Sequence, residues 1–416
     1  MPTAAEATLR PRLEHIDALR GLSALAVVLV HAFQIYNLGL PDIGDGTGGL
    51  TDSAMHVLIR ILYEWFFQLG ALAVPIFIML SGYSLMIPVA RSDQSMRTPQ
   101  HLRTFFVRRV RRILPSYYAA MALSLLIIAV VPSMGTPANV YWDRALRDLG
   151  AMNIVAHLLL VHNLNGDWGS AINPPFWSLP VEWQIYFLFP LLVLLWRRLG
   201  LTMMFLLTSI YVAIPSVFGI VLLPFTNVSF VLLFAIGMAG AMINFAPGAS
   251  ELRLRNQLPW WLLALAGLLV LFVMQLGRIA FGLPIRLMSL VAGMAILALV
   301  VACTKDQLSG RETRIGRALS HSSLTWLGLF SYSLYLVHMP ILAMFAAAAR
   351  ALSLSTTMSY LLVLLVGIPV ALLLAYGFHL VFERPFLHAP APKPYTHAVP
   401  DAPPRHVIVP GEKGGS

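Results

Sequence analysis

The stretch LRGLSALAVVLVHAFQI, residues 19–35, is an apolar run that nevertheless carries an arginine and a histidine. A membrane-spanning helix needs roughly 20 predominantly apolar residues. Ionisable side chains inside hydrocarbon are costly, and those that occur there are usually functional. On a helix, Arg20 and His31 lie roughly 16 Å apart at about 1.5 Å per residue. If the arginine lies at one membrane face, the histidine lies near mid-bilayer. The stretch therefore predicts a membrane helix that links a water-facing site to a buried one.

Composition places the whole chain in the same class. Of its 416 residues, 58% are hydrophobic and 11% are charged, which is too few charges for a soluble globular protein. We expect an all-α polytopic integral membrane helix bundle, with the lipid bilayer as its surroundings. The single cysteine, Cys303, provides neither a disulfide framework nor a thiolate metal site, and no metal is expected. The net charge of +10 comes from basic residues beside apolar spans, so nucleic acid is not an expected partner.

About ten segments have the length and composition of membrane spans. They are residues 19–37, 71–90, 113–131, 177–196, 201–221, 227–245, 260–276, 286–304, 323–346 and 358–382. An even number puts both termini on one side. If that side is the cytoplasm, it holds 22 of the 28 lysines and arginines, as the positive-inside rule requires. Both termini are therefore predicted to be cytoplasmic.

The chain divides into three predicted parts. Residues 1–17 form a cytoplasmic N-terminal segment and residues 18–387 form the membrane domain. Residues 388–416 form a tail rich in proline, glycine and charge, which predicts disorder. Two long connections, 38–70 and 132–176, contain stretches with helical apolar spacing at 54–67 and 143–162. We expect these stretches to lie along the membrane interface and to cover an outward-facing cleft.

A dense cationic segment, FFVRRVRRILP at residues 105–115, enters the third predicted span. Its four arginines occupy five positions, and guanidinium groups bind phosphate oxygens in a bidentate geometry. The segment therefore suits a phosphorylated donor. It is equally typical of a topology anchor or of a contact with anionic lipid headgroups.

A second polar motif, PPFWSLPVEWQIY at residues 174–186, stands at the outer entrance of the fourth predicted span. Glu182 lies among aromatic residues, and Trp177 offers the flat surface on which sugars stack. The alternative is an interfacial aromatic belt with one carboxylate hydrogen-bonded to a neighbouring helix.

The other polar residues have simpler structural explanations. For His338, the usual explanation is a buried histidine bonded to a backbone carbonyl. His157 and His162 are five residues apart and do not share a helical face, so they predict no metal pair. Ser81 stands in a small-residue segment, Ser-Gly-Tyr, that favours close helix packing.

Five stretches, taken in order, resemble the membrane acyltransferase-3 family: residues 16–31, 77–83, 109–115, 177–182 and 332–338. The resemblance runs from about residue 13 to residue 385. The family's basic residue, ten intervening residues and histidine are matched by Arg20 and His31. Its Arg-x-x-Arg motif is matched by Arg109 and Arg112, and Arg108 with Arg111 is the overlapping alternative.

The resemblance implies an O-acyltransferase of the bacterial inner (plasma) membrane. Such an enzyme moves an acyl group, usually acetyl, from cytoplasmic acyl-CoA to a hydroxyl of a cell-surface polysaccharide or another glycosylated acceptor. Acyl-CoA is then a co-substrate, and no bound cofactor is expected.

The residues then take expected roles. His31 is the base that removes the acceptor's proton, or a carrier of the acyl group in a covalent variant. Glu182 is the second residue assigned to catalysis, and with Trp177 on the opposite face it orients the acceptor or His31. Arg20, Arg109 and Arg112 neutralise the CoA phosphates, and Asp17 pairs with Arg20 across one helical turn. Ser178, Ser81 and His338 are assigned supporting positions.

Two other functions fit the same pattern. A small-anion or proton-coupled transporter would use the buried Arg, His and Glu, with His31 as a proton relay. The chain shows neither the repeat symmetry nor the paired helix breaks of such transporters. A glycan polymerase would need cations on the outer face, whereas the arginine cluster is predicted on the inner face.

Overall fold

A computed structural model describes residues 13–35, 50–92, 96–138, 140–218, 229–281 and 285–387. These residues form helices and connecting loops and contain no strand, so the predicted all-α class is confirmed. The N-terminal segment is described from residue 13 onwards, and the tail 388–416 lies outside the described residues.

The long helices are α2 (Glu14–Gln34), α3 (Leu50–Arg91), α4 (Pro99–Val130), α7 (Ser178–Phe218), α8 (Ser229–Phe245), α10 (Trp260–Phe281), α11 (Ile285–Leu308) and α14 (Ser331–Ala351). The short elements are α5 (Pro132–Gly135), η1 (Tyr141–Leu146), α6 (Ala151–Leu158), η2 (His162–Leu164), η3 (Pro174–Trp177), α9 (Ala249–Gln257), α12 (Arg314–Leu319) and α13 (Ser322–Leu329). The chain then continues through α15 (Thr356–Leu362), η4 (Val363–Gly367), α16 (Ile368–Phe378), η5 (His379–Glu383) and α17 (Arg384–Leu387).

Within the described residues, eight helical segments are long and apolar enough to cross a membrane. A ninth arises if α8 and α9, which meet at 92°, count as one span. The predicted spans 177–196 and 201–221 both fall in α7, which loses its helical backbone at Gly200, with φ 81° and ψ 176°. If α7 is counted as two segments divided at Gly200, the described residues hold about ten spans, and the predicted bundle is confirmed. The cytoplasmic location of both termini stays a prediction.

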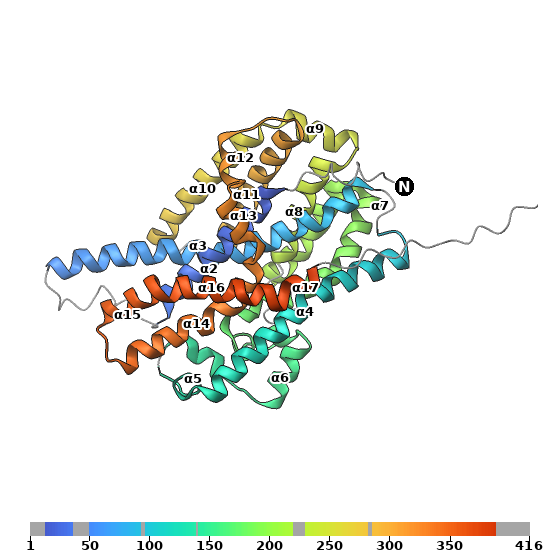
Figure 1. Cartoon of the computed structure of the whole chain (residues 1–416). Helices are drawn as coiled ribbons and strands as arrows, with labels where there is room; N and C mark the ends of the chain where they lie inside the picture. The colour runs from blue at the N-terminus through green and yellow to red at the C-terminus, as the bar shows by residue number, and fades with distance from the viewer. Residues whose placement is uncertain are drawn as a thin grey trace, which may run out of the picture.

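Helix α2 lies inside the bundle and packs against α3, α13 and α14 (Figure 1). Two glycines bring α2 and α13 into backbone contact, because a Cβ atom at Gly21 would lie 2.7 Å from the amide nitrogen of Gly328. Helices α3 and α8 meet in the same way, since a Cβ at Gly82 would lie 2.1 Å from the carbonyl oxygen of Phe234. The expected close packing around Ser81 is therefore observed, and it is the packing that small residues permit in membranes.

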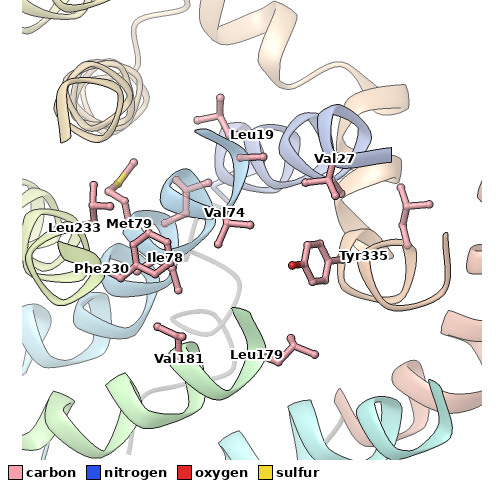
Figure 2. Close-up of a cluster of buried hydrophobic side chains, with 14 of the residues drawn as sticks. Leu19, Val27, Val74, Ile78, Met79, Leu179, Val181, Phe230, Leu233 and Tyr335 are labelled. Carbon is pink, nitrogen blue, oxygen red and sulfur yellow. The ribbon is translucent and has the colours of Figure 1, made fainter. Parts of the chain in front are cut away.

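Apolar side chains from five helices fill the space between these contacts (Figure 2). They include Leu19 and Val27 of α2, Val74 and Ile78 of α3, Leu179 and Val181 of α7, Phe230 and Leu233 of α8, and Tyr335 of α14. The ring of Tyr335 brings a hydroxyl group into this apolar region, which matters for the site described below.

The two predicted covers differ from each other. Residues 54–67 contain no proline or glycine and continue α3 without a break, rather than forming a separate segment. Residues 132–138 and 140–176 contain short elements, here called the cover, with α5 and α6 at one edge of the bundle (Figure 1); their place over an outward-facing cleft stays a prediction. This cover meets the end of α2, where the Tyr141 amide donates to the carbonyl of Ile35 at 3.0 Å.

Candidate active site

Helix α2 places Arg20 and His31 on one face. Eleven residues are close to three turns of about 3.6 residues, so the two side chains point in nearly the same direction. The buried side chains of Ala24 and Val27 lie between them on that face. One rigid helix therefore sets both the direction and the separation of the two groups.

Arg20 lines a cavity of about 80 Å³, here called the arginine cavity. Its walls come from α2 (Arg20), α3 (Val74, Phe77, Ile78, Ser81), α4 (Arg109, Arg112, Ile113), α7 (Ser178, Leu179, Glu182, Tyr186) and α14 (Ser331, Tyr332, Tyr335). The wall thus combines three guanidinium groups with apolar side chains and a few uncharged or acidic polar groups.

The structure distinguishes between the two overlapping Arg-x-x-Arg assignments. Residues three apart on α4 share a face, and Arg109 and Arg112 are half-buried in the cavity wall. Arg108 and Arg111 are exposed and lie outside that wall. The pair Arg109 and Arg112 is therefore the one that faces Arg20 across the cavity.

The polar contacts within the cavity leave an excess of positive charge. Arg20 Nη2 donates to Ser84 Oγ at 3.1 Å, and the guanidinium carbon of Arg109 lies 5.9 Å from the centre of the Tyr186 ring. Glu182 is the carboxylate of this wall, and it accepts from the hydroxyl of Tyr186 and from Ser81 Oγ, the latter at 3.1 Å. Three guanidinium groups against one carboxylate suit an anionic ligand.

The position of Glu182 differs from the expectation. The sequence analysis put Glu182 on the face opposite the arginines, whereas it lies in the same cavity. The reason is η3, whose Pro174, Pro175 and Phe176 are buried. Because this turn enters the bundle, α7 begins inside the protein, and its first turns lie level with the arginines.

Of the other residues with predicted roles at the site, some line the arginine cavity and others lie outside it. Trp177 lies outside the cavity wall, with its ring 6.2 Å from that of Phe230. Ser178 lines the cavity, and its hydroxyl lies 2.7 Å from that of Tyr335. Asp17 lies outside the cavity wall but interacts electrostatically with Arg20.

His31 pairs with His338. Nδ1 of His31 lies 2.8 Å from Nε2 of His338, and the two rings are stacked with their centres 5.1 Å apart. Nδ1 of His338 lies 2.9 Å from the carbonyl oxygen of Leu334. His338 thus bonds to a backbone carbonyl, as expected, and also to His31.

These contacts determine the tautomers of a neutral pair. A carbonyl oxygen only accepts, so the proton of His338 is on Nδ1 and its Nε2 accepts. Nδ1 of His31 must then donate to that Nε2, which leaves Nε2 of His31 with a lone pair. This assignment rests on the hydrogen-bond network. His31 is therefore held in the form that can remove a proton through Nε2.

Tyr335 separates the arginine cavity from the histidine pair. Its ring lines the cavity and lies 6.1 Å from the ring of His338. Its hydroxyl donates to the carbonyl of Pro175 at 2.8 Å, so the hydroxyl of Ser178 donates to the tyrosine oxygen. Figure 2 shows the Tyr335 ring pointing towards Val74 and Leu179, into the space between α3 and α7.

Residues 13–378 match the model of the acyltransferase-3 family, which is described as an acyltransferase domain. The chain belongs to this family. It is similar to the acyltransferase MdmB of Streptomyces mycarofaciens, with 27% identity over 190 residues. That match covers 45% of this chain and 40% of MdmB, so the chain matches less than half of the relative's length. No solved structure matches. The resemblance seen in its motifs is thus confirmed.

Two residues of the candidate site, Tyr186 and Tyr335, have no role predicted from the sequence. Tyr186 follows Glu182 by one helical turn, a spacing that predicts a shared face. Tyr335 stands in the same motif as His338, three residues before it. These two spacings are the sequence signals that could have indicated them.

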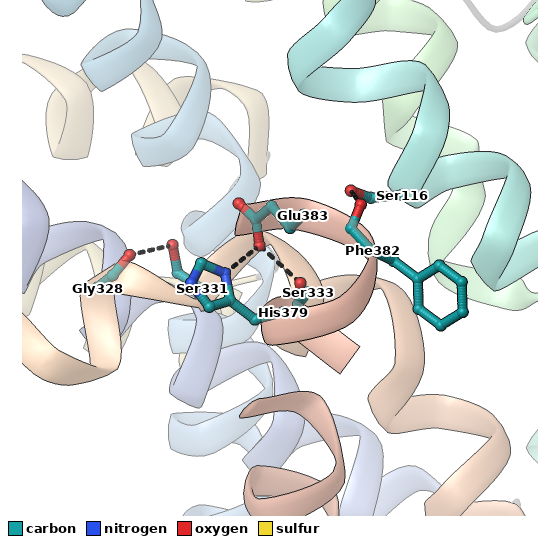
Figure 3. Close-up of polar contacts among 7 residues, drawn as sticks. All are labelled: Ser116, Gly328, Ser331, Ser333, His379, Phe382 and Glu383. Carbon is teal, nitrogen blue, oxygen red and sulfur yellow. Dashed lines mark hydrogen bonds and ion pairs between the residues drawn. The ribbon is translucent and has the colours of Figure 1, made fainter. Parts of the chain in front are cut away.

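A buried polar cluster joins the helices that carry the candidate site (Figure 3). Ser333 donates to Glu383 Oε2 at 2.6 Å, and Nδ1 of His379 lies 2.8 Å from the same oxygen. Ser116 Oγ of α4 donates to the carbonyl of Phe382 at 2.9 Å. The π-helical turn η5 thus ties α4, which carries the arginines, to α14, which carries His338. No sequence motif pointed to this cluster.

His157 and His162 come together although they do not share a helical face. The chain reverses at Leu160, with φ 54°, and stacks the two rings 3.8 Å apart at 3°. A metal ion could not lie in the planes of two parallel rings, so the pair is no metal site. Each ring contacts a backbone carbonyl, that of Asn153 at 3.0 Å or that of Phe176 at 3.1 Å. Burial lowers the pKa of His157 to about 4 and that of His162 to about 3.

Proposed function

We propose that this acyltransferase moves an acyl group, most simply acetyl, from acyl-CoA to a hydroxyl of a cell-surface polysaccharide or another glycosylated acceptor. The proposal includes the bacterial inner membrane as its location and a cytoplasmic donor. One observation carries it: the hydrogen bonds of His31 leave Nε2 as a lone-pair acceptor, on the helix face that also carries Arg20 into a cationic cavity.

The arginine cavity supports an acyl-CoA donor. Arg20, Arg109 and Arg112 present guanidinium groups that match phosphate oxygens. The apolar residues of the wall, including Val74 and Leu179, suit the less polar arm of CoA and its acyl group. A ligand of CoA size needs a pocket of about 300 Å³ or more, so the cavity of about 80 Å³ holds only part of the donor.

A neighbouring cavity of about 270 Å³ supports a place for the rest of the donor. It shares Arg109 with the arginine cavity and adds Arg108, His101 and Phe105. The nucleotide part of CoA could contact the ring of Phe105 and the cationic or polar groups of Arg108 and His101 in this cavity. The thioester arm then runs from Arg109 past Arg20 towards Tyr335.

The chemistry assigned to His31 is general-base catalysis. Nε2 takes the proton of the acceptor hydroxyl, the hydroxyl oxygen attacks the thioester carbonyl, the carbon–sulfur bond breaks, and CoA leaves as the thiol after taking up the proton. His31 is transiently an imidazolium, whose Nδ1–H still donates to His338. In the covalent variant the same Nε2 attacks the thioester and carries the acyl group. His338 supports both routes by keeping Nε2 unprotonated.

The first test uses purified protein in nanodiscs with labelled acetyl-CoA, without acceptor and then with cell-envelope glycans. We expect thioester turnover or glycan labelling by the wild type, its loss in His31→Ala, and weak donor binding in Arg20→Ala. Arg111→Ala is the matched control, because Arg111 is an exposed arginine of the same helix as Arg109 but outside the cavity wall. A folded wild type that neither binds acetyl-CoA nor turns it over would refute the donor assignment and favour small-anion transport.

A further inference from the structure

The 3₁₀ turn η1 places a cation beside His31. The ring of Tyr141 lies 5.4 Å from that of His31, and the guanidinium carbon of Arg144 lies 4.5 Å from the centre of the same tyrosine ring. Together the two contacts put that carbon within about 10 Å of the centre of the His31 ring. Arg144 also acts electrostatically on His31. This group is distinct from the arginines at the other end of α2.

The backbone around η1 is held on both sides. The Tyr141 amide donates to the carbonyl of Ile35 at the end of α2. The carbonyl of Ala145 accepts from the amide of Ile172 at 2.8 Å. Ile172 has φ 64°, a left-handed conformation that is strained for a β-branched residue and persists only where the surrounding structure enforces it. The cover therefore presents Arg144 from a fixed backbone.

Arg144 remains available to a ligand. The carboxylate of Asp143 accepts from the amides of Ala138 and Val140 at 3.1 Å, and that of Asp148 accepts from the indole of Trp168. In the described part of the chain, no hydrogen bond joins a carboxylate to the exposed Arg144. A guanidinium resting on an aromatic ring is oriented in advance and offers its N–H edges as a planar fork.

We infer that the acceptor is an acidic sugar, whose carboxylate binds Arg144 while a hydroxyl of the same ring lies at Nε2 of His31. This inference rests on the function proposed above and names the class of its acceptor. Because the guanidinium carbon lies within about 10 Å of the centre of the His31 ring, the carboxylate and a hydroxyl of one sugar ring can reach both groups with hydrogen bonds of about 2.8 Å. The planar carboxylate matches the guanidinium fork, and Tyr141 lies beside the ring that joins them.

The experiment compares methyl glycosides that differ only at C6, as carboxylate or hydroxymethyl, in the gluco, galacto and manno series. Full-length protein in nanodiscs is given labelled acetyl-CoA, and kcat/KM is measured for each glycoside. Acetyl-CoA hydrolysis without acceptor reports on the donor half alone. The variants are Arg144→Gln and, as the matched control, Arg147→Ala, which removes an exposed arginine from the same cover.

We expect at least one acidic glycoside to be used about 10- to 100-fold better than its neutral partner, since a hydrogen bond to a charged group is worth that factor. Arg144→Gln should abolish the preference by raising KM for the acidic glycoside, while Arg147→Ala and acetyl-CoA hydrolysis stay unchanged. Equal use of both partners, a preference that survives Arg144→Gln, or hydrolysis without transfer to any acidic glycoside would overturn the inference. An equal loss of kcat on both partners would show that Arg144 acts on the reaction, which also overturns it. A folded wild type that neither binds acetyl-CoA nor turns it over, with or without acceptor, would refute the proposed function instead.

Discussion

In the proposed mechanism His338 determines which nitrogen of His31 is the base, and this role can be tested directly. In His338→Leu, Nδ1–H of His31 loses the acceptor that now lies 2.8 Å away. The imidazolium formed during transfer then lacks a charge-assisted hydrogen bond worth about 1.5–3 kcal/mol. At about 1.4 kcal/mol per factor of ten, we expect kcat to fall about 10- to 100-fold.

The matched variant is His338→Gln, whose amide oxygen can take the place of the imidazole acceptor. We expect it to recover much of the activity, because the tautomer of His31 is then preserved. The assay is single-turnover acetyl transfer in nanodiscs, with acetyl-CoA binding measured in parallel. Binding should be unchanged in both variants, since His338 is outside the arginine cavity. Wild-type kcat in His338→Leu, or equal losses in both variants with binding intact, would refute the reasoning.

Three further predictions follow from the contacts. Arg112→Ala should raise KM for acetyl-CoA about tenfold by removing a phosphate ligand, whereas Arg111→Ala should leave it unchanged; equal effects would contradict the assignment of the cavity. Tyr335→Phe should lower the free energy of unfolding by about 1–3 kcal/mol, since it leaves buried polar groups unpaired, and an unchanged melting temperature would contradict this. The lowered pKa values of His157 and His162 mean that the unfolded chain binds protons first as the pH falls. The contribution of the two histidines to the free energy of unfolding should therefore be fully present above about pH 6.5 and should decrease as the pH falls towards 4. Melting scans of the double variant His157→Gln/His162→Gln should show a flatter pH dependence, and an equally steep one would refute the assignment.

The fold class was predictable because bilayer thickness sets the length of an apolar helix. The break at Gly200 was implied by two adjacent spans, whereas the length of α3 was not, since nothing in residues 54–67 marks where an interfacial helix would end. Both features depend on local sequence. The prediction is correct where a local signal marks a helix end and wrong where no such signal is present.

The site was predictable where it depends on one helix. The spacing of Arg20 and His31 follows from helical geometry, and so does the shared face of Arg109 and Arg112. The depth of Glu182 depends on how η3 packs inside the bundle, which no spacing reveals. The bond between His31 and His338 joins residues 307 positions apart, and no spacing in the sequence indicates that Arg144 lies near His31.

Because Arg20 and His31 share one uninterrupted helix, α2 fixes the distance between the proposed donor-binding group and the proposed base. An α-helix neither stretches nor shortens appreciably when its neighbours shift, so changes in bilayer thickness or in the packing of the bundle leave this length intact. Under the proposed function, different acyl groups on the CoA arm reach the same depth along α2, that of His31, whatever their chemistry. A single residue inserted between the two would turn His31 by about 100° away from its partner, although every side chain of the site would still be present.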